Sequence, residues 1–228
     1  MTESTLLLAF SLLAFLFTIS VHESAHALVA DRCGDPTARL LGRVSLNPLR
    51  HMELFGTVLV PLLTAWSGMP VIGWAKPTPV DVSRLRRPGR DNVLVSAAGP
   101  ASNLATALLC LLALFVLRLA STEGAAIVER LALVGSAGLH GSFLNPLATL
   151  LHRLLYISLI LGMFNLLPIP PLDGSHIVGQ WLPVPLQAAY RSAAPFGFLI
   201  LMAVFWYTPV DQWLFDRPMG WCNALLRM

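Results

Sequence analysis

The strongest constraint on the fold is a set of long segments that contain neither a charged residue nor a histidine. They are residues 4–21, 54–75, 92–117, 154–172 and 192–210. A helix needs about 20 apolar residues to cross the hydrocarbon core of a bilayer, because it rises about 1.5 Å per residue. Only 12% of the 228 residues are charged, whereas an ordinary soluble domain is about a quarter charged. We therefore expect lipid, rather than water, to surround most of the chain.

These segments predict an all-α polytopic membrane protein with about four transmembrane helices. Segment 54–75 is interrupted by Pro61, Gly68 and Pro70, and such interruptions favour a re-entrant segment. A plain transmembrane helix is the alternative for this segment. Residues 125–139 are apolar but contain charges and glycines, so we interpret them as an interfacial helix on the far side of the membrane.

Two shorter segments, 38–47 and 71–82, show short β-like patterns with turn residues. They predict small strands at the cytosolic edge of the membrane. The chain shows no polar linker, low-complexity tract or repeat, so residues 1–228 are predicted to form a single domain. The formal net charge is only +3, and no aromatic and basic stripe accompanies it, which argues against a nucleic-acid partner.

Nine of the fifteen lysines and arginines lie in two segments, residues 32–50 and 76–90. Basic loops prefer the cytoplasmic side of a membrane, so we expect both segments to face the cytosol. Segment 54–75, which joins them, would then enter and leave the bilayer on one side.

The motif that carries chemistry is His22-Glu23-Ser24-Ala25-His26, at the end of the first apolar segment. Residues four apart share one face of a helix, so His22 and His26 can offer imidazole nitrogens to one metal ion. Glu23 is displaced by one position and can reach a metal-bound water, as in the HExxH arrangement of two zinc ligands and a general base. The alternative is that these residues only mark a helix end at the interface. Ionisable groups inside membrane segments are costly and usually functional, which favours the metal site.

A catalytic zinc ion needs a third protein ligand and an open position for water. Asp173 is the candidate, because it lies in the proline-rich sequence NLLPIPPLDG at residues 165–174. The prolines forbid a regular helix there, so this backbone must line a cavity or be buried in protein. The other histidines lack a partner at ligand spacing, and we interpret them as interfacial or solvated residues. They are His51, His140, His152 and His176.

Together these motifs resemble the site-2 protease family of intramembrane zinc metalloproteases, in its compact prokaryotic branch. HESAH at residues 22–26 matches the family HExxH, and NLLPIPPLDG at 165–174 matches its Asn-Pro and Leu-Asp-Gly signature. GPASN at residues 99–103 matches the family GPxxN on the helix between them. The resemblance covers most of the chain, residues 4–174, and includes the stretch GWAKPTPV at residues 73–80.

The resemblance implies one zinc ion with three protein ligands: His22, His26 and Asp173. It implies that Glu23 is the base and proton shuttle. Asn165 and Asn103 match polar positions that line the family active site, where an amide can hold the substrate strand or the developing oxyanion. It also implies a transmembrane protein substrate and a place in the plasma membrane of a prokaryotic cell, with the active site towards the cytosol. We expect no PDZ or cystathionine-synthase-type regulatory domain.

The resulting hypothesis is an intramembrane zinc endopeptidase that hydrolyses peptide bonds within or near transmembrane segments. The alternative is a non-proteolytic metal-binding membrane protein, either a transporter or a degenerate scaffold, which would have no need of Glu23 as a base. Membrane parity gives an independent check. The zinc ligands share one side of the membrane only if segments 54–75 and 125–139 both cross it or neither does.

Overall fold

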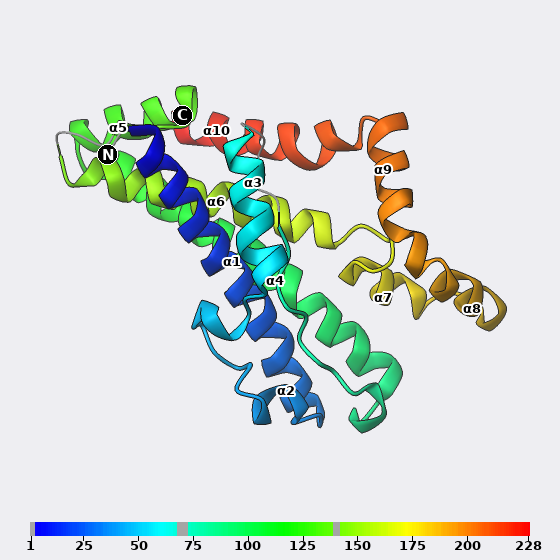
Figure 1. Cartoon of the computed structure of the whole chain (residues 1–228). Coiled ribbons are helices and arrows are strands. Elements are labelled where there is room, and N and C mark those ends of the chain that lie inside the picture. Colours follow the sequence, from blue (N-terminus) through cyan, green and yellow to red (C-terminus); the bar gives the residue numbers. More distant parts are fainter. Residues whose placement is uncertain (1–2, 68–72, 139–141) are drawn as a thin grey trace.

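The computed structural model describes residues 3–67, 73–138 and 142–228, and every regular element in these ranges is a helix. Three long helices form the centre of the molecule: α1 (Glu3–Cys33), α4 (Pro88–Ala120) and α6 (Leu144–Asn165). Each of them is long and apolar enough to cross a membrane. The three helices pack against one another (Figure 1). The chain is therefore a multi-pass membrane protein.

The central helices approach closely because small side chains lie between them. On α1, Ala14, Thr18 and Ser20 are buried. The hydroxyls of Thr18 and of Ser158 on α6 lie 3.0 Å apart in a hydrogen bond between the two helices. Small residues and such polar contacts hold helices together in lipid, where apolar burial by itself gains little.

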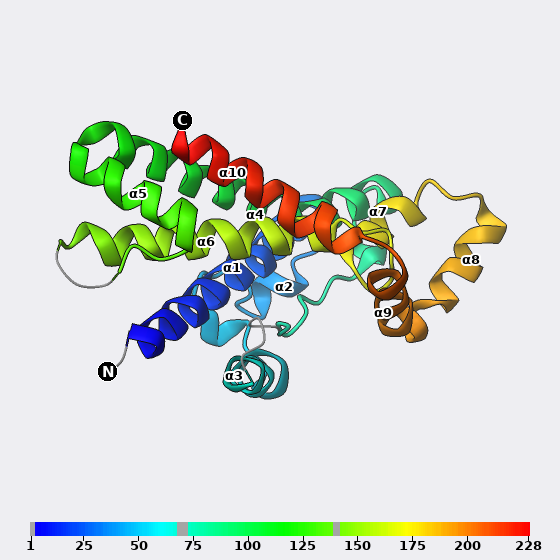
Figure 2. The ribbon, with the colours of Figure 1, turned by 90° about the horizontal axis from the view of Figure 1, so that it is seen from above.

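Two further helices, α5 (Thr122–Val134) and α10 (Arg217–Arg227), cover one end of α4 and α6 (Figure 2). The hydroxyl of Ser121 begins α5 by accepting a backbone N–H of its first turn. Gly135 ends it with a left-handed conformation at φ 73°. The helix expected within residues 125–139 therefore begins earlier and is shorter. The π-helical turns of η5 (Gln212–Asp216) lead into α10.

The last apolar segment does not form one straight helix. α8 (Val184–Ser192), the 3₁₀ turn η4 (Ala194–Phe196) and α9 (Gly197–Tyr207) follow one another, with a bend of 40° between the α8 and α9 parts. Pro195 has no backbone N–H for a helical hydrogen bond, which accounts for the break. The described residues hold three spanning helices, or up to four if the bent pair crosses as one. The predicted helical membrane fold is confirmed, whereas the number of spans is not fixed.

The segment after Glu53 leaves the bundle as a helix and returns beside its own start. The π-helix η2 (Leu54–Leu59) continues into α3 (Val60–Trp66). After the return, the backbone N–H of Trp74 donates to the carbonyl of Gly56 at 3.0 Å, and its indole N–H donates to Glu53 Oε2 at 2.8 Å. A Cβ at Gly56 would overlap this indole, so a glycine is needed there. Both ends of the segment lie together, as a re-entrant segment requires.

The prediction of two β-strands is wrong. Residues 38–47 begin inside α2 (Thr37–Leu40) and continue as turns. The described part of segment 71–82 is extended from residue 73 but pairs with no strand in the described chain, because Pro77 and Pro79 have no N–H to offer a ladder. Its other N–H groups donate to scattered acceptors. The backbone N–H groups of Trp74 and Lys76 donate to the carbonyls of Gly56 and His51. Those of Thr78 and Asp81 donate to Glu23 Oε2 and Asp35 Oδ2.

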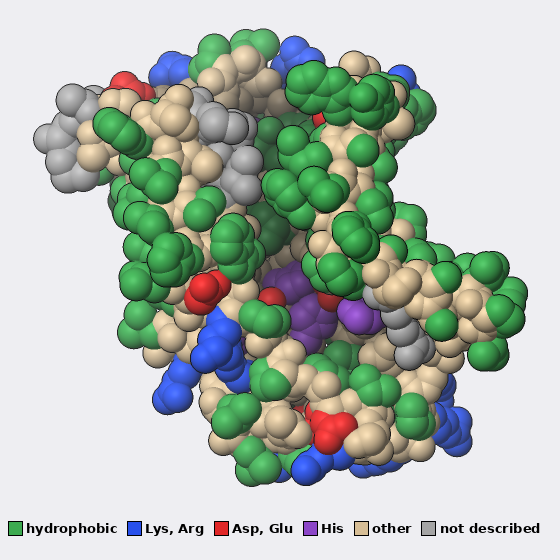
Figure 3. All heavy atoms as spheres, turned by 45° about the vertical axis from the view of Figure 1, so that its right-hand side comes forward, with side chains coloured by type: hydrophobic (Ala, Val, Ile, Leu, Met, Phe, Trp, Pro, Cys, Tyr) green, Lys and Arg blue, Asp and Glu red, His purple; other side chains and the backbone are tan. Residues whose placement is uncertain are grey.

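The two basic segments lie together at one end of the molecule (Figure 1), and Figure 3 shows lysine and arginine side chains at this end, with others at the opposite end. They include the short 3₁₀ helices η1 (Pro48–Arg50) and η3 (Val82–Arg84). The carboxylate of Asp35 joins them, since its Oδ2 accepts the backbone N–H of Asp81 at 2.7 Å. Burial raises the pKa of Asp35, but hydrogen bonds from Thr37 and Asp81 outweigh it and hold this pKa below its usual value.

Candidate metal centre

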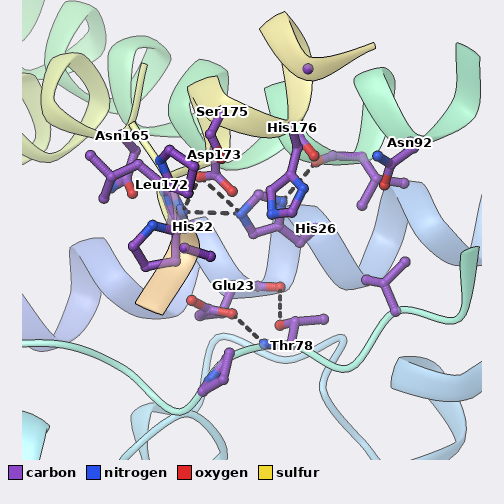
Figure 4. Close-up of a pocket in the computed structure, with 18 of the residues that line it drawn as sticks. His22, Glu23, His26, Thr78, Asn92, Asn165, Leu172, Asp173, Ser175 and His176 are labelled. Atoms are coloured by element: carbon purple, nitrogen blue, oxygen red, sulfur yellow. Dashed lines mark hydrogen bonds and ion pairs between the residues drawn. The ribbon is translucent and has the colours of Figure 1, made fainter. Parts of the chain in front are cut away.

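The two histidines of the HExxH motif lie on one face of α1 and point toward Asp173 (Figure 4). The side chains of His22 and His26 are buried, and their Nε2 atoms lie 3.0 Å apart. Oδ2 of Asp173 lies 3.1 Å from Nε2 of His22 and 3.4 Å from Nε2 of His26. One ligand atom from each of the three residues therefore falls within 4.8 Å of the others. The structure brings together residues that are 147 positions apart in the sequence.

Asp173 reaches the histidines because the chain stops being helical after α6. Prolines follow Asn165 and prevent the helix from continuing, and Asp173 is the first residue of the next helix, α7 (Asp173–Gly179). The backbone turns sharply here, since a Cβ at Gly174 would overlap the carbonyls of Leu166 and Leu167. The glycine of the Leu-Asp-Gly motif is therefore needed for steric reasons.

The orientation of each imidazole is fixed by the nitrogen that faces away from Asp173. Nδ1 of His26 lies 2.7 Å from the carbonyl of Val95 on α4, so Nδ1 carries the proton and donates it. Nδ1 of His22 lies 3.1 Å from the side-chain amide of Asn103, and Oδ1 of Asn103 is buried without a partner. The two amide ends are nearly indistinguishable in shape, and turning the amide places Oδ1 where it accepts from Nδ1 of His22. Both Nε2 atoms then present lone pairs to the same point.

A metal ion fits this donor set. Burial raises the pKa of the Asp173 carboxyl, and protons on the two imidazoles would outweigh burial and hold this pKa well below its usual range, so positive charge at this point keeps the group a carboxylate. When both Nε2 atoms present lone pairs instead, Oδ2 of Asp173 is buried without a hydrogen-bond donor among the described residues. Two imidazole lone pairs and one carboxylate oxygen that meet without a proton between them need a shared cation. Two nitrogens, one oxygen and an open side facing a cavity are a donor set that suits a catalytic zinc ion.

Gly99 on α4 completes the pocket for the two imidazoles. A Cβ at this position would overlap Nε2 of His26 and the ring of His22. Sequence analysis matched this glycine to the GPxxN motif without giving it a function. Its role is steric, because only a glycine lets α4 lie this close to both rings.

Glu23 is held by the extended segment that lies beside α1 (Figure 4). Its Oε2 accepts the backbone N–H of Thr78 at 2.8 Å, and the hydroxyl of Thr78 donates to the Glu23 carbonyl at 3.0 Å. Thr78 lies between Pro77 and Pro79, so its N–H is the single backbone donor of this Pro-Thr-Pro run. No periodicity or motif in the sequence predicted this contact.

A cavity of about 1100 Å³ opens beside the three ligand atoms. Its wall includes Glu23 and Asn165, both expected at the site. The side-chain N–H of Asn165 donates to the carbonyl of Leu161 at 2.9 Å, which leaves a second N–H of the amide for other partners. Asn103 is fully buried behind His22 and does not line this cavity. Its expected contact with substrate is therefore corrected to a contact with the ligand histidine.

The interpretation of the other histidines as solvated or interfacial is wrong at two positions. His51 is fully buried, with Nε2 at 2.7 Å from the carbonyl of Ser45. His152 is 5% exposed, because α5 and α10 cover α6 at this point. His176 is exposed and lines the cavity of the metal centre, and His140 lies outside the described residues.

A helical membrane bundle that holds two HExxH imidazoles and a carboxylate around one point, with a glutamate beside them, defines the class of membrane metalloproteases. The family model of Peptidase family M50 matches residues 10–204. The chain belongs to this family, the site-2 proteases, and it is a zinc metalloprotease.

Relatives named as zinc metalloproteases support this assignment. YwhC of Bacillus subtilis is 34% identical over 208 residues, which cover 91% of this chain and 84% of the relative. Rip2 of Mycolicibacterium smegmatis is 30% identical over 207 residues, which cover 89% of this chain and 68% of the relative. Rip2 of Mycobacterium tuberculosis is 30% identical over 214 residues. No solved structure matches the chain significantly.

Proposed function

We propose that residues 1–228 form a single intramembrane protease domain that hydrolyses peptide bonds within or near the transmembrane segments of other membrane proteins. The observation that carries this proposal is the convergence of His22, His26 and Asp173 on one point, at the wall of a large cavity inside a helical membrane bundle. Soluble proteases work in water, whereas these ligands lie on or directly after apolar spans. Substrate must therefore reach them from the bilayer or its edge.

The residues around the site divide the chemistry between them. Zinc bound by the three ligands would act as a Lewis acid that polarises the scissile carbonyl and lowers the pKa of a bound water to about 7. Glu23 would take the proton of the attacking water and pass it to the leaving amine. The N–H of Thr78 holds Oε2 of this carboxylate, which leaves Oε1 for the water. The spare N–H of Asn165 would stabilise the oxyanion, while Asn103 would orient His22.

The apolar walls of the hollow above the site suit a transmembrane substrate. Figure 3 shows histidines at the base of a hollow between two apolar columns, which α3 and α9 form. Large side chains on both helices are exposed: Leu62, Leu63 and Trp66 on α3, and Phe198, Met202 and Trp206 on α9. A substrate helix could pack there before its backbone unwinds, which it must do because helical carbonyls are bonded to N–H groups.

We further propose that the active site faces the cytosol from the plasma membrane of a prokaryotic cell. The loops that hold nine of the fifteen lysines and arginines share one end of the molecule (Figure 1), and such loops prefer the cytoplasmic side. Glu53 and Trp74 meet, so the segment between them returns to the side it left. If α1, α4 and α6 are the crossings before Asp173, the three zinc ligands share one side of the membrane.

The decisive experiment compares cells that carry the wild-type chain with cells that carry Glu23→Gln. The variant keeps the zinc ligands but has no base, so purified protein should retain zinc while membrane-protein fragments disappear and uncut precursors accumulate. Quantitative proteomics of membrane fractions measures both. Glu129→Gln, an exposed glutamate on α5 at the far end, is the matched control and should cut normally. Full cleavage by Glu23→Gln would show that Glu23 is not the base.

The competing function is a metal transporter or a scaffold that binds zinc without proteolysis. A transporter would move zinc across the membrane of proteoliposomes and would not need Glu23 to take a proton from water. Zinc flux that persists in Glu23→Gln, without peptide cleavage by either protein, would favour this alternative.

A further inference from the structure

A second cavity lies between α5, α6 and α10, away from the metal centre. Its volume is about 200 Å³. On α6, His152 of this cavity and Asn165 of the catalytic cavity are separated by about 20 Å at 1.5 Å per residue. Its wall is apolar on one side, with Leu131 and Met219 both buried. The two cavities share no lining residue, so the second one needs its own explanation.

The cavity contains a cation for which the described residues supply no counter-ion. Arg153 lines it, and Nε of this guanidinium is buried without a hydrogen-bond partner. None of the ion pairs among the described residues involves Arg153, and no aspartate or glutamate lines the cavity. The carboxyl end of α5 lies at the same cavity, but a helix dipole offsets only about half a charge. A cation on a membrane helix is costly unless an anion or water pairs with it.

Further polar groups on the same wall are poorly satisfied. The side chain of His152 is buried, and its Nδ1 has no hydrogen-bond partner. Its Nε2 lies 3.5 Å from Oδ1 of Asn223 on α10, at the outer limit for a hydrogen bond. An oxygen-rich group beside Arg153 would give these side chains the partners that the protein itself does not supply.

We propose that this cavity binds the phosphate of an anionic phospholipid. Arg153 pairs with the phosphate oxygens in the geometry that a guanidinium favours. His152 with its proton on Nδ1 donates a hydrogen bond to an ester or headgroup oxygen, while its Nε2 accepts an N–H of Asn223 once that amide is turned about its axis. The apolar wall contacts the first carbons of the lipid. The source is a lipid rather than a free anion, because the cavity lies on a membrane-spanning helix and Leu133 at its wall is 61% exposed. Bound lipid then ties α5 and α10 to α6.

The test is native mass spectrometry of the full chain in detergent, with separate additions of phosphatidylglycerol, phosphatidylcholine and inorganic phosphate. Wild type should retain phosphatidylglycerol in preference to phosphatidylcholine. Arg153→Gln should weaken that binding about tenfold, the loss expected for one charge-assisted hydrogen bond or more. Arg153→Lys keeps the charge, and its affinity for phosphatidylglycerol should lie between those of wild type and Arg153→Gln. Binding by this variant would show that a substitution at position 153 leaves the fold intact. Arg130→Gln, an exposed arginine on α5, is the matched control and should bind as wild type does.

Two outcomes would overturn the proposal. Equal retention of phosphatidylglycerol by wild type and Arg153→Gln would show that the lipid binds elsewhere. Binding of inorganic phosphate that depends on Arg153, without retention of phosphatidylglycerol, would identify a free-anion site instead. A further measurement supports the proposal: phosphatidylglycerol should raise the melting temperature of wild type and Arg130→Gln but not of Arg153→Gln.

Discussion

Two histidine-bearing cavities of the same helical bundle differ in where their polar atoms point. At the candidate metal centre, Nε2 of His22, Nε2 of His26 and Oδ2 of Asp173 converge within 4.8 Å. Each ring is oriented by a hydrogen bond at its other nitrogen, Nδ1. At the second cavity, His152 and Arg153 are neighbours in sequence, lie beside an apolar wall and have no acidic partner in the described part of the chain. A buried histidine on a membrane helix is therefore not a metal ligand by itself. Convergence with a carboxylate distinguishes the candidate metal centre from the second cavity.

The largest expected difference between the two cavities is in zinc content. His22→Leu removes one of three ligands and should weaken zinc binding about hundredfold or more, the scale expected when a site loses a ligand or its support. His152→Leu removes a histidine of similar burial and should keep one zinc ion per chain. Mass spectrometry of metals in the purified proteins measures both. Equal zinc loss in the two variants would contradict the distinction.

A smaller effect is expected from Gly99→Ala, which leaves every ligand in place. The added Cβ overlaps both imidazoles, and overpacking of this kind costs about 1–3 kcal/mol, or about tenfold in zinc affinity. Competition with a chelator measures the affinity. Gly220→Ala on α10 is the control, since no atom lies within 4 Å of the added Cβ. Wild-type zinc affinity in Gly99→Ala would mean that the two helices lie further apart.

The smallest effect is expected at Thr78, which contacts the proposed base Glu23 but none of the three proposed metal ligands. Thr78→Pro removes the N–H that holds Oε2 of Glu23 and should lower kcat about fivefold, the effect of about 1 kcal/mol for one hydrogen bond, with zinc content unchanged. Thr78→Val removes only the hydroxyl and keeps the N–H, so it should retain most of the activity. Cleavage assays in detergent with a transmembrane peptide compare the two. An identical kcat for both variants would show that the N–H of Thr78 does not contribute to catalysis.

Local periodicity was enough to predict two of the three residues of the candidate metal centre. His22 and His26 are one helical turn apart, so any helix brings them together. Asp173 was predicted because proline forbids a helix before it and the family motif marks its position. The Pro-Thr-Pro run shows where local patterns failed. A short β-like pattern with turn residues predicted a strand, but the N–H groups that a ladder requires are absent at Pro77 and Pro79.

The remaining features depend on contacts between distant segments. The role of Gly99 follows from the position of α4 against α1, which the sequence of α4 does not specify. Asn103 looked like a substrate contact because it is polar and belongs to a motif, yet its amide faces the back of His22. The burial of His152 depends on α5 and α10 folding over α6, and no pattern around this histidine predicted such a cover.

Zinc K-edge X-ray absorption on the purified full chain tests the central claim most directly. The wild-type spectrum should show two imidazoles with nitrogen at about 2.0–2.1 Å and a carboxylate oxygen at about 2.0–2.2 Å. Asp173→Ala should lose bound zinc or show a shell without the carboxylate. Sulfur scattering at about 2.3 Å, or a spectrum of Asp173→Ala identical to wild type, would place the zinc ion elsewhere in the chain.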